Sequence, residues 1–226
     1  MTAIAPNAEA TTTSAPERMP LRMSYAEWLT WEHEGGLTEW VDGEVIVLTP
    51  PTILHQRIVG FLSTLLHLFT QMYHLGQVLA APVGMRAIVG GNGREPDVLF
   101  LATENLGFLT ERAVEGPADL VVEVISEDSV ARDRGDKFYE YQEGGVREYW
   151  IIDPRPSKQR VDLYVIDRDA RYQPVPVASD GAYHSAVLPG FYLKEGWLWA
   201  DEPNPLAALV ELVGLERMME ALRAST

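Results

Sequence analysis

Two short segments of the chain, residues 119–125 and 146–152, are almost continuously apolar, and the stretch between them has helical character. Apolar runs of this length are typical of β-strands that are covered on both faces. One helix is predicted over Asp133–Glu143, with Asp133 as its N-cap, Asp136 at its third position and Gly144-Gly145 as its stop. This strand, helix, strand crossover restricts the chain to an α/β fold.

The remaining pattern predicts the elements around this crossover. A chain of 226 residues favours one main domain over two. In the first half of the chain we expect a mobile tail over 1–20, a short helix from the capping box of Ser24 and Glu27 to Gly35-Gly36, and a hairpin over 39–48. A long helix over 52–75, closed by Gly76, and strands over 78–81, 83–89 and 97–101 follow. After the crossover we expect an edge strand over 161–166, turn-rich strand material over 171–200 and one last amphipathic helix over 204–223. The expected fold is a mixed central sheet flanked by helices. Its core domain spans 21–200, with an N-terminal helix and hairpin and a C-terminal β extension, and a C-terminal helix follows within 201–226.

Charge and composition exclude several kinds of site. The chain has no cysteine, so disulfides, thiolate nucleophiles, zinc–thiolate sites and iron–sulfur clusters are excluded, and any metal must bind oxygen or imidazole ligands. The net charge of −15 repels nucleic acid at long range, but screening over roughly 8–10 Å lets a local cationic patch override it. No segment approaches the run of about 20 apolar residues that a membrane helix needs, and Met1–Pro20 lacks a signal core. We therefore expect a cytoplasmic protein that does not contact membranes.

An acidic residue interrupts the first apolar strand. Glu123 stands in the middle of residues 120–125, where burial of an unpaired ionised carboxylate costs several kcal/mol, so it must be protonated, paired or bound to a cation. Asp97 follows Pro96 and opens the apolar segment 97–101. If the two strands are neighbours, both acids project from one region of the sheet, where two hard oxygen ligands suit Mg²⁺ or Mn²⁺.

A structural role explains either acid by itself. Aspartate after proline is common at turns, so Asp97 alone is well explained as a cap of its strand. Glu123 can pair with a buried arginine such as Arg86 or Arg147. The two acids together favour a metal site.

The order of several motifs resembles that of a known family over about residues 22–200. The motifs are Glu39 to Glu44 ahead of a double proline, Pro96-Asp97, the run from Asp119 to Ser126, Asp133 with Lys137 and Tyr141, and the run from Gly145 to Pro154. This order is similar to that of the Uma family of putative restriction endonucleases, a branch of the PD-(D/E)XK nuclease superfamily. The resemblance implies a restriction-endonuclease-like core and a metal-dependent endonuclease that hydrolyses DNA phosphodiester bonds with Mg²⁺ (or Mn²⁺).

The resemblance also implies roles for individual residues. Asp97 and Glu123 match the two acids of the family, which together with the backbone carbonyl of Val124 would hold the ion that activates a water molecule. The family pattern continues with a lysine two residues after the second acid, on the same side of the strand. This chain has Ile125 at that position, so the site lacks its strand lysine.

Lys137, in the next helix, is the expected replacement, to stabilise the transition state or orient the nucleophile. The alternative is a solvated helix charge beside acidic neighbours. Glu39 matches an acid that many members use as an extra metal or water ligand, although alone it is better explained as a surface residue of the hairpin. His55 is either a polar contact at a helix N-terminus or a catalytic residue, and Tyr141 is expected to pack in the core.

Five cations flank the expected site in the sequence, and both phosphate binding and ordinary surface charge explain them: Arg132, Arg134, Arg155, Lys158 and Arg160.

Three hypotheses about the function of the chain follow. The chain is an active endonuclease, or a catalytically inactive nuclease-fold module for binding or regulation, or a protein whose acids are structural. In the third, the apolar face of the last helix either mediates self-association, as in a homodimer, or covers its own domain.

Overall fold

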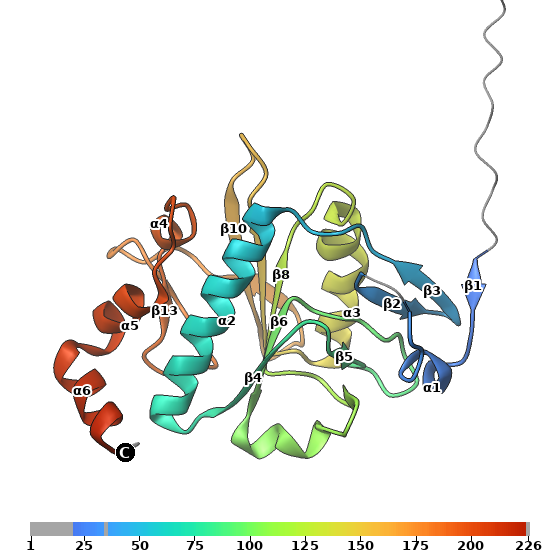
Figure 1. The fold of residues 1–226 in the computed structure, drawn as a ribbon, viewed down its shortest axis with the longest axis horizontal. Coiled ribbons are helices and arrows are strands. Elements are labelled where there is room, and N and C mark those ends of the chain that lie inside the picture. Colours follow the sequence, from blue (N-terminus) through green and yellow to red (C-terminus); the bar gives the residue numbers. More distant parts are fainter. Residues whose placement is uncertain (1–19, 34–35, 225–226) are drawn as a thin grey trace, which may run out of the picture.

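The computed structural model describes residues 20–33 and 36–224, and a mixed six-stranded β-sheet forms its centre (Figure 1). In spatial order the strands are β11 (Tyr172–Pro174), β10 (Arg160–Ile166), β9 (Glu148–Asp153), β8 (Leu120–Val124), β6 (Val98–Ala102) and β4 (Gly76–Ala80). β8 and β9 run parallel, and the other neighbouring pairs of this sheet are antiparallel. The predicted crossover therefore supplies the two middle strands of the sheet.

Successive side chains of the middle strands face two different helical layers. On one face, α2 (Ile53–Tyr73) and α5 (Pro205–Val213) cover a core that includes Val122. On the other face, α3 (Lys137–Gly144) covers a second core that includes Val121. Because every residue of β8 is buried, a charged side chain in this strand needs partners inside the protein.

Smaller elements surround the central sheet. They are β1 (Leu21–Arg22), α1 (Tyr25–Trp28), β2 (Thr38–Val41), β3 (Glu44–Val47), β5 (Gly84–Met85), the 3₁₀-helix η1 (Thr103–Phe108), β7 (Ala113–Val114), the π-helix η2 (Arg132–Asp136), β12 (Tyr183–His184), β13 (Tyr192–Leu193), α4 (Glu195–Leu198) and α6 (Leu215–Ala224). Strands β1, β2 and β3 form a small antiparallel sheet. Two backbone hydrogen bonds between Trp40 and Gly93, of 2.7 and 2.8 Å, attach this sheet to the segment ahead of β6.

Several predicted helix boundaries are confirmed. The capping box of Ser24 and Glu27 begins α1, Thr52 caps the start of α2, and Gly145 ends α3 in a left-handed conformation (φ 87°). The β2–β3 turn is the predicted Asp42-Gly43 pair, in which both residues have positive φ. These features depend on contacts within a few residues, which is why the sequence indicates them.

Two helix ends differ from the prediction. α1 ends at Trp28, well before Gly36, and Gly35 lies outside the described residues. α2 is closed by His74 in the left-handed conformation (φ 52°), and Gly76 instead opens β4. Histidine is among the side chains that tolerate this conformation.

Two predicted strands also differ. Within 83–89 only β5 is a strand, since it pairs with the equally short β7, and the chain then turns where the Gly91 N–H donates to the Ile88 carbonyl at 2.8 Å. The segment 161–166 is not an edge strand, because β10 pairs with β9 on one side and β11 on the other. Its alternation is confirmed, with Val161 and Leu163 buried.

The helix predicted over 133–143 begins earlier than expected. The π-helix η2 precedes α3 directly, and Asp133 lies buried inside this helical segment instead of capping it. Its carboxylate is 3.2 Å from the ammonium of Lys137, four residues later, so the side chain is unavailable as a cap. Short π-helical segments of this kind are frequent at functional sites.

The last predicted helix is two helices. Gly214, with φ 79°, separates α5 from α6. Ala208 and Leu209 of α5 are buried in the core that α2 covers. Of the predicted tail, only Pro20 is within the described residues. No helix in the described part of the chain is long and apolar enough to span a membrane.

Candidate active site

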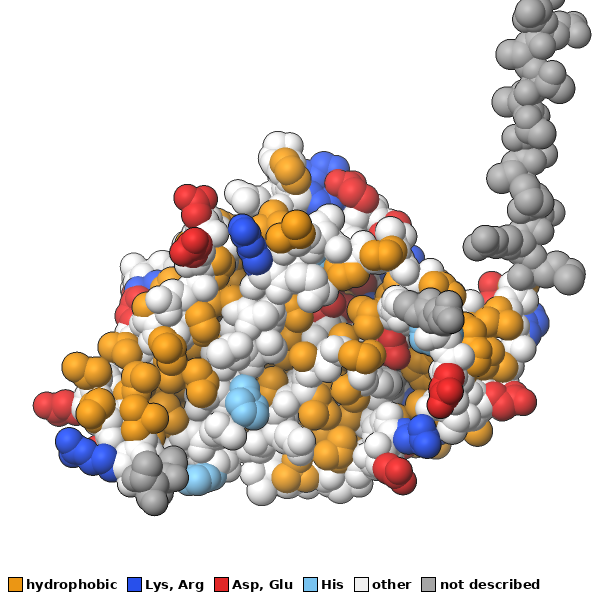
Figure 2. All heavy atoms as spheres, in the orientation of Figure 1, with side chains coloured by type: hydrophobic (Ala, Val, Ile, Leu, Met, Phe, Trp, Pro, Cys, Tyr) orange, Lys and Arg blue, Asp and Glu red, His pale blue; other side chains and the backbone are white. Residues whose placement is uncertain are grey.

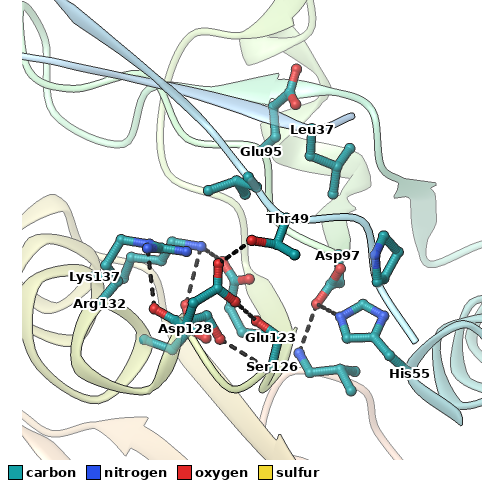
Figure 3. A pocket seen from close by; sticks show the side chains of 15 residues that line it. Leu37, Thr49, His55, Glu95, Asp97, Glu123, Ser126, Asp128, Arg132 and Lys137 are labelled. Carbon is teal, nitrogen blue, oxygen red and sulfur yellow. Dashed lines mark hydrogen bonds and ion pairs between the residues drawn. The ribbon is translucent and has the colours of Figure 1, made fainter. Parts of the chain in front are cut away.

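A small pocket of about 40 Å³ opens where β8 ends and where α2 and η2 begin (Figure 3). Its polar lining comes from segments far apart in the sequence: Thr49, His55, Glu95, Asp97, Glu123, Ser126, Asp128, Ser129, Arg132, Asp133 and Lys137. Three of the predicted side chains, those of Asp97, Glu123 and Lys137, therefore share one pocket, which Val124 also lines. Glu39 is not part of its wall.

The sheet register brings the two acidic residues together. Val98 of β6 is paired with Val122 of β8 in antiparallel register, so Asp97 lies opposite Glu123 one position further. Directly opposed residues of an antiparallel pair project from the same face. This is the face that α3 covers, because Leu99 and Val121, two residues away, belong to the core beneath that helix. The two strands are therefore neighbours, as the prediction of a shared metal site required.

Asp97 is held through one of its two carboxylate oxygens. Oδ2 accepts a hydrogen bond from the Val124 N–H at 2.7 Å and lies 3.3 Å from Nε2 of His55. Among the described residues, none donates a hydrogen bond to Oδ1. Asp97 therefore connects two strands and a helix, and it does not cap the turn before its own strand.

His55 belongs to the first turn of α2, and its two parts have different partners. Its backbone N–H donates to the Thr52 hydroxyl at 3.2 Å, and its ring is buried beside Asp97. Burial would lower the pKa of His55, but the hydrogen bond and the charge of Asp97, with a hydrogen bond to the Val124 backbone, raise it above its usual value. The neighbouring carboxylate therefore stabilises the charged form of the ring.

Glu123 is likewise held through one oxygen. Its Oε1 accepts hydrogen bonds from Nζ of Lys137 at 2.9 Å and from the hydroxyl of Tyr141 at 3.0 Å. No described residue donates to Oε2. The prediction that Arg86 or Arg147 pairs with Glu123 is wrong, since Arg86 pairs with Glu115 at 2.8 Å and Arg147 with Asp119 at 3.2 Å.

Lys137 is the centre of a buried ionic cluster. Its Nζ lies 2.7 Å from Oε1 of Glu39, 2.9 Å from Oε1 of Glu123 and 3.2 Å from Oδ1 of Asp133. The residue is only 2% exposed, so it is not a solvated helix charge. An ammonium group has three N–H donors, and here three carboxylates surround it.

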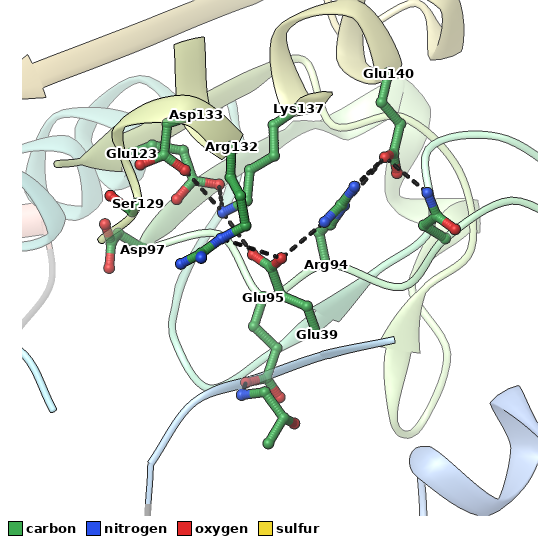
Figure 4. Close-up of polar contacts among 12 residues, drawn as sticks. Glu39, Arg94, Glu95, Asp97, Glu123, Ser129, Arg132, Asp133, Lys137 and Glu140 are labelled. Atoms are coloured by element: carbon green, nitrogen blue, oxygen red, sulfur yellow. Dashed lines mark hydrogen bonds and ion pairs between the residues drawn. The ribbon is translucent and has the colours of Figure 1, made fainter. Parts of the chain in front are cut away.

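A second cation fixes Glu39 from behind the pocket (Figure 4). Arg94 is buried, and its NH1 donates to Oε2 of Glu39 at 2.7 Å while its NH2 donates to Glu140 of α3 at 2.7 Å. Arg132 lies further away, with its Nε 4.0 Å from the same Glu39 oxygen. Glu39 thus bridges Lys137 and Arg94 and is not the surface residue that a hairpin position suggests.

The pKa values follow from this arrangement. Burial raises the pKa of Glu123 well above its usual value, and the nearby acids Asp133 and Asp97 add to the rise against the opposing charge of Lys137. Burial would lower the pKa of Lys137, but the surrounding carboxylates raise it instead. Burial would raise the pKa of Glu39, yet Lys137 and Arg94 hold it below its usual value. The pocket therefore contains one strongly held cation and an excess of acid.

The five flanking cations differ in their surroundings. Arg132 lines the pocket, and Lys158 is exposed. The other three pair with two aspartates: Arg134 and Arg160 with Asp162, at 2.7 and 2.6 Å, and Arg155 with Asp153 at 2.8 Å. The aspartates neutralise much of this positive patch.

Three participants are missing from the sequence-based set of site residues. Arg94 gives no local signal, because it stands between a glycine-rich turn and Pro96 and its partners are 55 and 46 residues away. Asp133 was assigned as a helix cap, although its spacing of four from Lys137 indicates an ion pair. Tyr141 does pack in the core, but its hydroxyl also donates to Glu123, and its spacing of four from Lys137 already places it on the same helix face.

The comparisons with known proteins agree with this architecture. A model of the Uma2 family, described as putative restriction endonucleases, matches residues 24–196. A solved structure of a putative nuclease of DUF820 from Anabaena variabilis is similar over 78% of this chain and 97% of that protein, with a TM-score of 0.62 and 15% sequence identity, a likeness of fold. None of the curated proteins compared with the chain matches it. Because the family model covers most of the chain, including every residue of the pocket, this protein belongs to the Uma2 family of putative restriction endonucleases.

Proposed function

We propose that the protein is a metal-dependent endonuclease that hydrolyses phosphodiester bonds of DNA. One observation carries the proposal: Asp97 and Glu123, opposed on neighbouring strands, each have one oxygen saturated by two protein groups and one oxygen without a described protein partner, in the same pocket. Two fixed carboxylates, each with one oxygen left over, are suited to a shared divalent cation. The family and the similar fold of a putative nuclease support the same activity.

The donor set fits Mg²⁺ or Mn²⁺. Within the described residues no group of three or more acidic or histidine side chains is placed to hold a metal by itself. Mg²⁺ commonly uses only one or two carboxylates and completes its octahedron with water and substrate phosphate oxygens. We assign Oδ1 of Asp97, Oε2 of Glu123 and the backbone carbonyl of Val124 as its ligands. When bound, the ion supplies an activated water molecule and neutralises charge on the phosphate.

In this proposal the chain's own residues keep the two acids in position. Lys137 and Tyr141 hold Oε1 of Glu123, which leaves Oε2 directed elsewhere. Glu39 holds Lys137, and Arg94 in turn holds Glu39, so Glu39 acts as a positioning residue. Lys137 donates a hydrogen bond to Glu123 and lies within ion-pair distance of Glu39 and Asp133, so a contact between Lys137 and the phosphate competes with these three acids.

A binding or regulatory module without catalysis is the second candidate. It is favoured by the position of Lys137, which is buried among three acids, and by the aspartates that neutralise Arg134, Arg155 and Arg160. Both candidates predict metal binding, but only the first predicts cleavage. Incubation of supercoiled plasmid with the protein and Mg²⁺ or Mn²⁺, with an EDTA control, separates them. Nicking that EDTA abolishes supports the enzyme, and Mn²⁺ binding without nicking supports the module.

Mn²⁺ is expected to bind the folded protein and to stabilise it. At a free concentration about 100 times its Kd, a ligand that binds only the folded state adds about 2.7 kcal/mol to the free energy of unfolding. Isothermal titration calorimetry gives the affinity and stoichiometry, and urea unfolding with and without Mn²⁺ gives the stabilisation. An unchanged unfolding midpoint at millimolar Mn²⁺, with no heat of binding, contradicts the proposed metal site.

Replacement of His55 is expected to weaken Mn²⁺ binding without unfolding the protein. In His55→Leu the Asp97 carboxylate loses one of the two groups that fix Oδ2, and loss of such a support typically lowers metal affinity about 10- to 100-fold. His55→Gln retains an N–H donor and should recover most of the affinity. His67→Leu, at an exposed position of the same helix, is the matched control. Equal affinities in all three variants argue against this role.

A further inference from the structure

The α6 helix carries an apolar face that no part of the described chain covers. Leu215, Met219 and Leu222 recur at the spacing i, i+4 and i+7, which places them on one side of the helix, and they are 62%, 43% and 55% exposed. Arg217 lies on the opposite side, where its guanidinium is 5.6 Å from the Tyr73 ring of α2. The charged side of the helix is therefore directed toward α2, and the apolar stripe lies on another side, with Leu222 at the edge of the space between the two helices.

The apolar surface continues beyond the stripe. A groove of about 770 Å³ separates α6 from the second half of α2, and Leu206 of α5, which is 52% exposed, lines it together with Leu222. In Figure 2 hydrophobic side chains gather over the region of α5 and α6. Isolated exposed apolar residues are ordinary, but a contiguous patch on a soluble chain marks an interaction surface.

The charges beside the stripe indicate which partner fits. Glu216 and Arg223 lie on the same flank of the stripe, seven residues apart, one near each end of α6. If a second α6 packs antiparallel against the first, each Glu216 lies beside the Arg223 of the other copy. In a parallel pair the two copies of this flank would lie on opposite sides of the seam, and Glu216 would not meet Arg223. In antiparallel helix pairs, residues on this flank are neighbours across the seam, so the helix is complementary to itself in one orientation.

We propose that α6 is a dimerisation helix, which pairs antiparallel with α6 of a second copy of this chain through Leu215, Met219 and Leu222. The arrangement is two-fold symmetric, so the same patch serves both copies and the assembly closes at two. The interface lies beyond residues 24–196, which the family model matches, and it does not depend on the proposed nuclease activity. A ten-residue helix is only about 15 Å long, so we expect a Kd in the micromolar range.

Analytical ultracentrifugation over about 1–200 µM protein tests the proposal, since the expected mass rises with concentration from 25.2 kDa to twice that value. Met219→Glu is expected to remain monomeric throughout this range. Val89→Glu, at an exposed apolar position outside α6, is the matched control and should behave as the unmodified chain. A wild-type mass of 25.2 kDa at every concentration, or a Met219→Glu chain that still dimerises, overturns the proposal.

A charge exchange tests the antiparallel orientation. Glu216→Arg and Arg223→Glu each place like charges at both ends of the seam and should weaken dimerisation by about tenfold or more. The double variant restores opposite charges and should recover the wild-type Kd. All these side chains are exposed, so circular dichroism should show a native fold in each variant. A double variant no stronger than the single ones overturns the antiparallel pairing.

Discussion

Plasmid nicking by the Asp97→Asn variant is expected to fall about a thousandfold or more in saturating Mg²⁺, while the protein stays folded. Asparagine is nearly isosteric with aspartate and still offers an acceptor to the Val124 N–H, which Asp97 binds at 2.7 Å. It removes the negative charge that the proposed ion requires. A gel-based nicking assay measures the activity, and calorimetry should show a parallel loss of Mn²⁺ affinity.

Asp119→Asn is the matched control for this variant. Asp119 is also a buried aspartate directly ahead of a strand of the central sheet, and it also accepts a backbone N–H at 2.7 Å, from Ala102. It lies at the other end of β8 and does not line the pocket, so its nicking activity should stay within about twofold of the unmodified protein below the unfolding temperature. Equal nicking by Asp97→Asn and the unmodified protein would show that the activity comes from elsewhere.

Lys137→Met is expected to produce the largest loss of stability, about 3–5 kcal/mol in the free energy of unfolding. Methionine fills a similar volume but leaves Glu39, Glu123 and Asp133 without their shared cation. Desolvated carboxylates without a counter-charge are strongly unfavourable. Urea unfolding at neutral pH measures the effect, and exposed Lys158→Met, expected within about 0.5 kcal/mol of the unmodified protein, is the control.

The same variant should recover part of its stability in mild acid. Burial raises the pKa of Glu123 above the ordinary value of 4.5, and loss of Lys137 removes the charge that most opposes the neighbouring acids Asp133 and Asp97. Between the unfolded and the folded pKa the folded state holds a proton that the unfolded state has released, so stability falls as pH rises through this interval. The difference between Lys137→Met and the unmodified chain should therefore be smaller near pH 5 than near pH 8. A difference independent of pH would argue against buried, uncompensated carboxylates as its cause.

The sequence predicts most of the elements around the site because their signals are local. The turn at Asp42-Gly43, the cap at Ser24 and the stop at Gly145 each depend on a few neighbouring residues. The prediction is wrong where distant contacts decide the outcome. The segment 161–166 is an interior strand because β11 adds to it, and most of 83–89 is not a strand because its partner β7 is only two residues long.

The sequence also indicates which acids are unusual. A carboxylate in an apolar strand is costly wherever that strand lies, so Glu123 had to have a partner or a proton. The sequence does not indicate which residue is the partner of Glu123, and the two arginines that it suggested pair with other acids. An ion pair depends on where helices and strands meet in space, and no periodicity along the chain encodes that meeting.

By itself, the sequence predicted the central crossover and singled out the acids at positions 97 and 123, because hydrophobic periodicity and the cost of buried charge act residue by residue, whereas Lys137 followed only from the family resemblance. Only the tertiary structure decided how these charges are shared. In the folded chain Lys137 lies among three acids, and Arg94 binds one of them, Glu39. One oxygen of Asp97 and one of Glu123 have no described protein partner. The physical reason is that the direction of a carboxylate's two oxygens is set by donors from segments that only the folded chain brings together.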